Sequence, residues 1–376
     1  MDISAAKRLF DITTRQAMFI EQVKMGETER LAATLQDLEK DLIKILGRLK
    51  YTELDSLSKA KLNILIAEIK ASQSRIYSRY QLQVLDRLRD FMAATTVQTM
   101  RLSASVYSHT GADDDVPLLS EEESREVIYA AAEEKENNGL FGLLVLAGTN
   151  AATNAMWSKV KNAPLPSGGS LLLNFVNFAF ANDIVKTEAV IRNAWVNKKT
   201  VSELKADLVG GTNKTKDAEG KVSEEIVKGS TARFNTAMGA VLATVIQHTA
   251  QQAISAVNST LWPRYVWVSV IDGVTSDICR KRNGKTWVYG KGPIPPAHVK
   301  CRSHTMPFEY YNPDFEMPTF YEWLKEQPDG FITSVFGSTI AAKFKSGSIR
   351  AADFDKFNPA TSKTIVDFLN GTDKLI

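Results

Sequence analysis

Apolar residues recur at intervals of three and four along the first hundred residues. One stripe comprises Leu31, Leu35, Leu38, Leu42, Leu46 and Leu49, and a second comprises Leu62, Leu65, Ile69, Ile76, Tyr80 and Val84. This spacing places each set on one face of a helix. The turn-forming stretch 50–56 separates them, so the pattern predicts two long antiparallel helices packed together. Such a pair can act as a protruding arm or oligomer contact, or be an ordinary helical hairpin.

Turn formers divide the middle of the chain. Breaks rich in turn residues occur at 109–120 and 162–170. Capping-box spacing of a hydroxyl residue and a glutamate predicts two helix starts, at Ser120 with Glu123 and at Thr200 with Glu203. The polar segment 212–223 is expected to be a loop, and a helix rich in small residues is expected over 231–257.

From Trp262 onward the pattern changes from helical to extended. The stretch RYVWVSVI (264–271) is β-branched and aromatic, which is typical of a strand, and NGK (283–285) predicts a hairpin turn before TWVYG. We therefore predict an α+β fold that is mainly α-helical. The expected parts are a helical hairpin or arm over 1–110, a helical middle domain over 120–210, a β-hairpin-containing module over 225–310, and a helical tail over 311–376 packing on that module.

The bulk composition is that of an ordinary soluble protein. Of the 376 residues, 44% are apolar and 24% are charged, and the net charge is +3. A near-neutral net charge argues against a domain that binds duplex DNA along its whole surface. Local basic patches are still compatible with this net charge. We expect no secretory signal, because the N-terminus lacks an apolar stretch after a charged one. The apolar runs 139–148 and 171–181 are shorter than the roughly 20 residues of a membrane span and are interpreted as buried helix segments.

One short window concentrates the chemistry of the chain. Both cysteines, Cys279 and Cys301, lie there with two of the four histidines, and no disulfide framework is indicated. Two thiolates and an imidazole suit Zn²⁺, so Cys279, His298 and Cys301 are candidate ligands. Asp272, His304 or water would complete the set. We take Asp272, Cys279, His298 and Cys301 as the candidate site of a structural zinc ion.

Two other interpretations of this window remain open. The thiols can be buried core residues, with the imidazole of His298 bonded to the loop backbone. Alternatively, a cysteine and a histidine can form a nucleophilic pair, although no glycine turn of the oxyanion-binding kind is evident. A basic cluster, Arg280, Lys281, Arg282 and Lys285, lies beside the expected turn. It is a candidate for phosphate contact or a solvated hairpin end.

The same window resembles a known protein family. Its residues follow the order of the C-terminal signature of phage minor head proteins, the Mu F-like head morphogenesis family: Trp267, Asp272, Thr275, Cys279, Gly284, Lys285, Pro295, Pro296, His298, Cys301 and Arg302. The stretch 320–354 is also similar to the family's tail, and the match covers about 225–368. Many members carry an Arg-Thr-Glu triplet in the preceding helix, where this chain reads VIQHTAQQ, so the resemblance implies no catalytic role through that triplet.

The resemblance implies a structural protein without an established enzymatic activity. Such a protein is a minor capsid component of a tailed phage, present in a few copies at the portal vertex, and it assists head assembly, DNA packaging or DNA delivery. The implied partners are the portal protein and the major capsid or scaffold protein, with phage DNA as a further contact. The implied location is the inside of the head, after assembly in the host cytoplasm. The recurrence of Asp272, Cys279, His298 and Cys301 as a set favours a metal or structural cluster.

The sequence is also compatible with two rival functions. A metal-dependent nuclease or phage-derived effector could use His298 and His304, but the proline-containing stretch 306–318 stands where a ligand-bearing helix would follow. The paired motifs of zinc deaminases are missing. A membrane-active ejection protein would rest on the two apolar runs.

Overall fold

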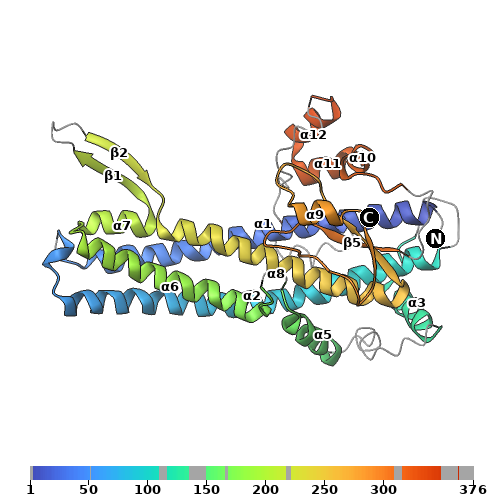
Figure 1. The fold of residues 1–376 in the computed structure, drawn as a ribbon, viewed down its shortest axis with the longest axis horizontal. Coiled ribbons are helices and arrows are strands. Elements are labelled where there is room, and N and C mark those ends of the chain that lie inside the picture. Colours follow the sequence, from blue (N-terminus) through green and yellow to red (C-terminus); the bar gives the residue numbers. More distant parts are fainter. Residues whose placement is uncertain are drawn as a thin grey trace. The chain divides into compact units, whose positions relative to one another are not determined.

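The predicted α+β fold, mainly α-helical, is confirmed. The computed structural model describes residues 3–50, 52–109, 117–134, 150–165, 168–216, 222–308, 316–348 and 363 (Figure 1). Within them the α-helices are α1 (Ile3–Gly47), α2 (Lys59–Ser108), α3 (Glu121–Glu134), α5 (Asn150–Asn162), α6 (Leu172–Val196), α7 (Val201–Val209), α8 (Ser230–Leu261), α9 (Asp277–Arg282), α10 (Phe320–Lys325), α11 (Asp329–Phe336) and α12 (Ser338–Lys345). The strands are β1 (Gly211–Lys216), β2 (Val222–Val227), β3 (Arg264–Val268), β4 (Thr286–Val288) and β5 (His304–Phe308), and a 3₁₀ turn spans Leu54–Ser56.

The chain forms two compact units, each built from segments that are distant in sequence. Unit 1 comprises Met1–Gly26, Arg87–Leu172 and Ala243–Ile376, and unit 2 comprises Glu27–Asp86 and Leu173–Leu242. Helices α1, α2 and α8 contribute residues to both units. The two long N-terminal helices that the leucine spacing predicted are therefore shared between the units.

The stripe residues within the two long helices are buried, as their spacing predicted, whereas Leu49 lies beyond the end of α1 and is half-buried. Leu31, Leu38 and Leu42 of α1 and Ile69 and Val84 of α2 are all buried. Helix α1 begins at Ile3, well before the leucine stripe, because an earlier apolar set that includes Leu9 and Phe10 is buried in the core of unit 1. Both capping boxes form as well: the backbone N–H of Glu123 donates to the Ser120 hydroxyl, and Thr200 and Glu203 cap α7 reciprocally.

The core of unit 2 contains a buried carboxylate between α2 and α6. The Tyr77 hydroxyl and the Gln73 amide both donate hydrogen bonds to Asp183 Oδ2, at 2.5 and 3.1 Å, and Gln73 also donates to the Thr187 hydroxyl at 2.9 Å. Burial raises the pKa of Asp183 to about 6, although these two hydrogen bonds oppose the shift. A carboxyl whose pKa is raised by folding makes stability depend on pH.

We expect the stability of unit 2 to fall as the pH rises from about 4 to about 6. The folded chain holds the Asp183 proton more tightly than the unfolded chain, so stabilisation is full at low pH and is lost as the pH passes the folded pKa. The raised pKa corresponds to a loss of about 2–3 kcal/mol. Chemical unfolding across this range, followed by helical circular dichroism, measures the slope. Asp183→Asn should remove the slope, and the exposed carboxylate variant Asp86→Asn should keep it; a slope that survives Asp183→Asn would contradict the assignment.

A β-hairpin replaces the loop that the sequence predicted over 212–223. Strands β1 and β2 pair antiparallel from Gly211 with Val227 to Lys216 with Val222, and the hairpin projects from the end of α7 (Figure 1). The prediction was wrong because both strands are polar, so they lack the alternation of apolar residues that signals a strand. Gly229 lies so close to Gly210 that a Cβ atom there would come within 2.3 Å of the Gly210 nitrogen.

Unit 1 contains a three-stranded antiparallel sheet in the order β4-β3-β5. Strand β3 pairs with β4 as predicted, but α9 is inserted between them, so NGK does not form a tight hairpin turn. Strand β5 was not predicted. It is an edge strand that pairs with the distant β3, and it contains Pro307, which sheets tolerate at edge positions. The side chains of Val266, Val268 and Met306 pack into one core with residues of α1 and α10–α12.

Helix α8 covers the outer edge of β5 with polar side chains. The Gln247 amide donates to the Ser303 carbonyl at 2.6 Å, and Gln251 Oε1 accepts from the Thr305 N–H at 3.1 Å. One turn earlier, the Thr244 hydroxyl accepts from the Lys300 N–H at 3.2 Å. These contacts stand where a neighbouring strand would bond, so the edge is closed and the segment before β5 is held in place.

Removing the Gln251 amide should destabilise unit 1. Gln251→Leu leaves the buried N–H of Thr305 without its acceptor, which costs about 1–3 kcal/mol. Denaturant unfolding measures the loss. Gln252→Leu, one position along α8 and partly exposed, is the matched control and should stay within about 0.5 kcal/mol of the parent. Equal losses in both variants would contradict the edge-covering role.

Of the two apolar runs, only 171–181 lies among the described residues. The run 139–148 lies outside the described residues. The run 171–181 opens α6, where Phe180 is buried as expected but Phe178 is exposed. Among the described residues, no helix combines the length and the apolar character that crossing a bilayer requires.

Candidate metal centre

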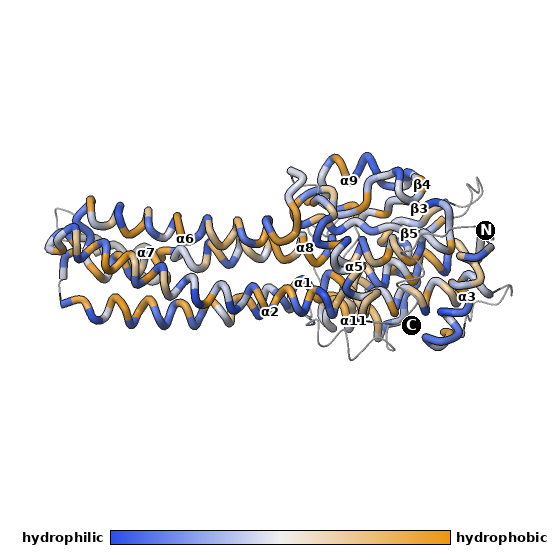
Figure 2. The backbone as a smooth tube through the Cα atoms, turned by 90° about the horizontal axis from the view of Figure 1, so that it is seen from below, coloured by the Kyte–Doolittle hydropathy of each residue, from blue (hydrophilic) through white to orange (hydrophobic). Residues whose placement is uncertain are grey.

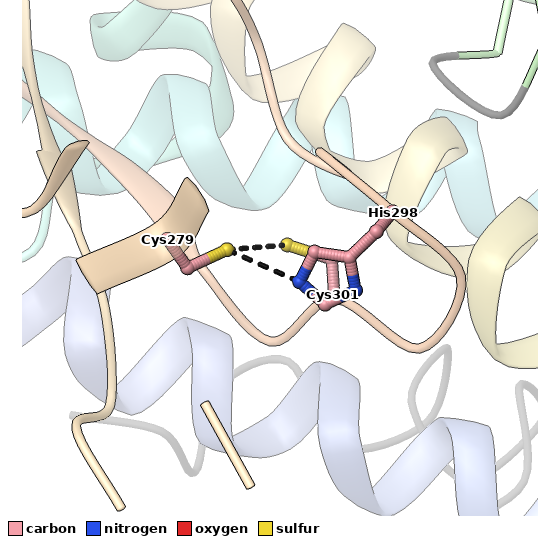
Figure 3. A group of neighbouring side chains, drawn as sticks. All are labelled: Cys279, His298 and Cys301. Atoms are coloured by element: carbon pink, nitrogen blue, oxygen red, sulfur yellow. Dashed lines mark hydrogen bonds between the residues drawn. The ribbon is translucent and has the colours of Figure 1, made fainter. Parts of the chain in front are cut away.

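Two short segments of unit 1 bring the candidate ligands together. Cys279 lies in α9, whose first turn is capped by the Ser276 hydroxyl accepting from the Cys279 N–H. His298 and Cys301 lie in the segment that leads into β5, where the Cys301 N–H donates to the His298 carbonyl and Lys300 adopts a left-handed conformation with φ of 60°. Figure 3 shows both sulfur atoms and the imidazole pointing at one another. The convergence predicted for these three residues is therefore present.

The spacing of the three donor atoms matches the demands of a tetrahedral ion. Cys279 Sγ lies 3.2 Å from His298 Nε2 and 3.7 Å from Cys301 Sγ, and all three atoms lie within 4.8 Å of one another (Figure 3). Two thiolates bound at about 2.3 Å to a tetrahedral zinc ion lie roughly 3.8 Å apart. The sulfur atoms are too far apart for a disulfide, and both cysteines are free. The group could therefore hold a metal ion, and its donor set fits Zn²⁺.

The imidazole is already oriented as a ligand. His298 Nδ1 lies 2.8 Å from the Val299 carbonyl oxygen. With the proton on Nδ1 donated to that carbonyl, Nε2 carries the free lone pair and faces the thiols. Metal-binding histidines commonly have such an outer hydrogen bond, which fixes both the tautomer and the ring orientation.

The surroundings of the thiols are apolar and anchored to α1. Trp267, Cys279 and Cys301 form a small buried cluster against Trp287 and Ala297. The buried Lys24 ammonium of α1 donates to the Cys301 carbonyl at 3.1 Å and also pairs with Glu21. The thiols are thus held from three sides by the sheet, α9 and α1.

Each of the two thiols shifts the pKa of the other. The hydrogen bond from the Cys279 thiol lowers the pKa of Cys301 well below its usual value, and the shared contact together with burial raises the pKa of Cys279. The hydrogen bond with Cys301 raises the pKa of His298. Metal ligation requires the thiolate form, and Cys301 is the thiol that is predisposed to it.

Asp272 lies outside the three-residue group. Its carboxylate accepts two hydrogen bonds from the Arg302 guanidinium, at 2.6 and 2.7 Å, and Oδ1 also accepts from the Thr275 hydroxyl and the Val274 N–H. The Asp272 side chain has no solvent exposure. The structure therefore assigns Asp272 to a buried ion pair, which fastens the loop before α9 to the residue that follows Cys301.

His304 also lies apart from the group. It is buried on β5, on the sheet face shared with Met306, and neither ring nitrogen has a hydrogen-bond partner among the described residues. Burial lowers the pKa of His304 to about 3, so the ring is neutral at ordinary pH. Of the two protein residues considered as a fourth ligand, neither is placed with the other three.

Two of the four residues of the predicted basic cluster, Arg280 and Arg282, make contacts with other residues of unit 1. Arg280 donates to the carbonyl oxygens of Thr275 and Asp272, and the Arg282 guanidinium lies 5.0 Å from the centre of the Trp267 ring. Lys281 and Lys285 are exposed. The stretch 262–308 contains eight lysine and arginine residues against two aspartates, so it is far more basic than the chain as a whole.

Sequence reasoning missed the residues that hold the group in place. Lys24 lies 277 positions from Cys301 in the chain, so nothing in the local pattern connects them. Gln247 and Gln251 have i, i+4 spacing within a helix that reads as apolar and small. Two glutamine side chains on the apolar face of such a helix could have indicated a polar contact with another element, because buried polar groups need partners.

The arrangement favours holding an ion over nucleophilic attack. Cys279 and Cys301 are 2% and 0% exposed, whereas reactive cysteines are partly open to solvent. Only the His298 side of the group is partly exposed. Comparisons of the chain with protein-family models, curated proteins and solved structures gave no match.

Proposed function

We propose that this chain is a structural minor head protein of a tailed phage, and that it works by binding other components of the head. In this proposal Cys279, His298 and Cys301 hold a structural Zn²⁺ ion. When bound, the ion would crosslink α9 to the segment before β5. The resemblance of the sequence window to the Mu F-like family supplies the phage context, and the geometry of the three ligands supplies the role of the ion.

The observation that carries the proposal is the spatial clustering of the resembling residues. Asp272 and Arg302 form a bidentate ion pair, and Cys279, His298 and Cys301 converge, although the five residues span 272–302. Residues that follow the order of the family's signature and also contact one another in the fold can act as a structural unit. Such a unit suits a small module that must keep its shape while it is bound in an assembly.

The proposed partners follow from the same resemblance. The portal protein is the primary partner, and the major capsid or scaffold protein is a further one, at the inside of the head near the portal vertex. The exposed Lys281 and Lys285 are the proposed contacts to phage DNA, because Arg280 and Arg282 are already engaged within the module. Contacts of this kind bind phosphates without reading sequence.

Binding to the portal ring tests the proposal. The full chain, mixed with the portal protein from the same genome, should co-sediment with the ring and appear as added density in electron micrographs. Portal binding should persist in Lys281→Ala/Lys285→Ala, whereas retention of DNA on a filter should weaken and lose part of its salt dependence. A chain that binds neither the portal nor assembled heads would overturn the proposal.

A metal-dependent nuclease is the second candidate. It is favoured by one observation: the group offers three protein ligands, and zinc sites with three protein ligands keep a position open for water or substrate. Zinc-dependent cleavage of plasmid DNA that disappears in His298→Ala would establish it. Intact plasmid after prolonged incubation with the zinc-loaded chain would remove it.

A further inference from the structure

Helix α6 carries a second row of apolar side chains, on the side facing away from the core of unit 2. Phe178, Val185 and Val196 are 71%, 64% and 68% exposed, and Ala181 and Ala189 are exposed between them. Spacings of seven and eleven residues place the three large side chains on one line along the helix. At 1.5 Å per residue the row is about 27 Å long. Single apolar residues scattered over a surface are normal, but a continuous row marks a contact site.

Helix α2 runs alongside α6 and complements it in side-chain size. The two helices are joined by contacts of Lys70 with Glu188, Gln73 with Asp183, Gln81 with Asn177 and Asn63 with Arg192. The outward side of α2 exposes mainly small residues, bordered by two large apolar ones: Ala67, Ala71, Ser74 and Ser78, with Ile64 and Leu82. We call these two rows of exposed residues the α2–α6 face: Phe178, Ala181, Val185, Ala189 and Val196 of α6, and Ile64, Ala67, Ala71, Ser74, Ser78 and Leu82 of α2. In Figure 2 hydrophobic and hydrophilic residues alternate along both helices.

The two rows of the α2–α6 face consist of uncharged side chains, and the charged side chains between them are paired, with a net charge of +1. Lys70 and Arg192 both pair with Glu188, which lies between the helices. A quarter of the chain's residues are charged, so the depletion is local. Depletion of charge and an apolar centre characterise the buried core of protein interfaces.

We propose that the α2–α6 face docks a second copy of this chain. In a two-fold symmetric pair, the large α6 row of each copy lies on the small α2 residues of the other, so that each contact occurs twice. The exposed side chains of the face would bury on the order of 500 Å² of accessible surface per copy. The pair would bury roughly 1,000 Å² in total, which reaches the lower limit for a specific interface. The side chains of the two rows are uncharged, so the rows of one copy meet those of the other without contact between like charges.

Sedimentation of the full chain tests the pairing without any other component. Analytical ultracentrifugation from about 1 to 100 μM should show a monomer–dimer equilibrium. Phe178→Glu/Val185→Glu should weaken the dimer at least about 100-fold, because each copy then buries two unpaired carboxylates. Ile226→Glu is the matched control: Ile226 is 88% exposed on β2, outside the face, and its variant should dimerise like the parent.

A second variant probes the small half of the face. Ser78→Trp adds bulk on α2 and should also weaken the dimer, whereas contacts made by α6 alone would be unaffected. Circular dichroism should show unchanged helix content in every variant, since all the changed side chains are exposed.

Three outcomes would overturn the proposal: a monomer at every concentration, a dimer that persists in Phe178→Glu/Val185→Glu, or a monomeric chain whose face is needed only for portal binding. The measurement uses no portal protein, so its failure leaves the proposed head function standing. Loss of portal binding would equally leave the dimer standing.

Discussion

Replacing Cys301 by serine should abolish metal binding and destabilise unit 1 by several kcal/mol. Cys301 is fully buried and lies with the other two donors in a group of three, so its loss leaves two ligands, too few for a protein zinc site. Metal-binding energy is folding energy wherever the site does not exist in the unfolded chain. At a free zinc concentration of about 1,000 times the dissociation constant, the bound ion contributes about 4 kcal/mol to the stability of the folded chain, and the variant should lose this contribution. Thermal unfolding with and without zinc measures it.

Chelation provides the control for this prediction. A strong chelator should lower the thermal unfolding midpoint of the parent chain towards that of Cys301→Ser. It should leave the unfolding midpoint of the variant unchanged. If neither zinc nor the chelator changes the unfolding midpoint of the parent chain, the proposed role of the ion is contradicted. It would support the interpretation of the window as a buried thiol turn.

Breaking the buried ion pair should produce the next largest effect. Asp272→Asn removes the charge that balances Arg302, whose side chain is only 14% exposed in the parent chain and loses its bidentate partner in the variant. Loss of one member of a buried pair costs about 3–5 kcal/mol. Denaturant unfolding should show this loss of stability. A crystal structure of the variant should show that the loop before α9 is displaced.

A double-mutant cycle distinguishes the ion pair from loss of packing. Asp272→Asn/Arg302→Met removes both charges and should recover much of the lost stability, because an apolar replacement of a buried pair is often tolerated. Asp277→Asn changes an exposed carboxylate in the first turn of α9 and should cost less than about 1 kcal/mol. Strictly additive losses in the double variant would show that the two residues are not coupled.

The sequence predicted best where one local pattern decided the structure. The leucine spacing of α1, the capping boxes at Ser120 and Thr200, and the strand at 264–268 needed only residues close in the chain. The hairpin β1–β2 was missed because polar strands have no apolar alternation to detect. Strand β5 was missed because its partner β3 lies more than thirty residues away, so only the pairing makes it a strand.

The candidate site shows the same limit at the level of side chains. The chemistry of Cys279, His298 and Cys301 could be predicted from residue type and spacing. The exclusion of Asp272 could not, because it depends on the competing partner Arg302, to which the pattern gave no weight. Lys24 and Gln251, which hold the segment carrying Cys301, act from other helices and become visible only in the folded chain.

Native mass spectrometry of the purified chain, alone and mixed with the portal protein from its own genome, tests the central claim most directly. We predict one zinc ion per chain, its loss in Cys301→Ser, and complexes of the zinc-bound chain with the portal ring. A metal-free mass together with no portal complex would contradict both the structural zinc and the head function.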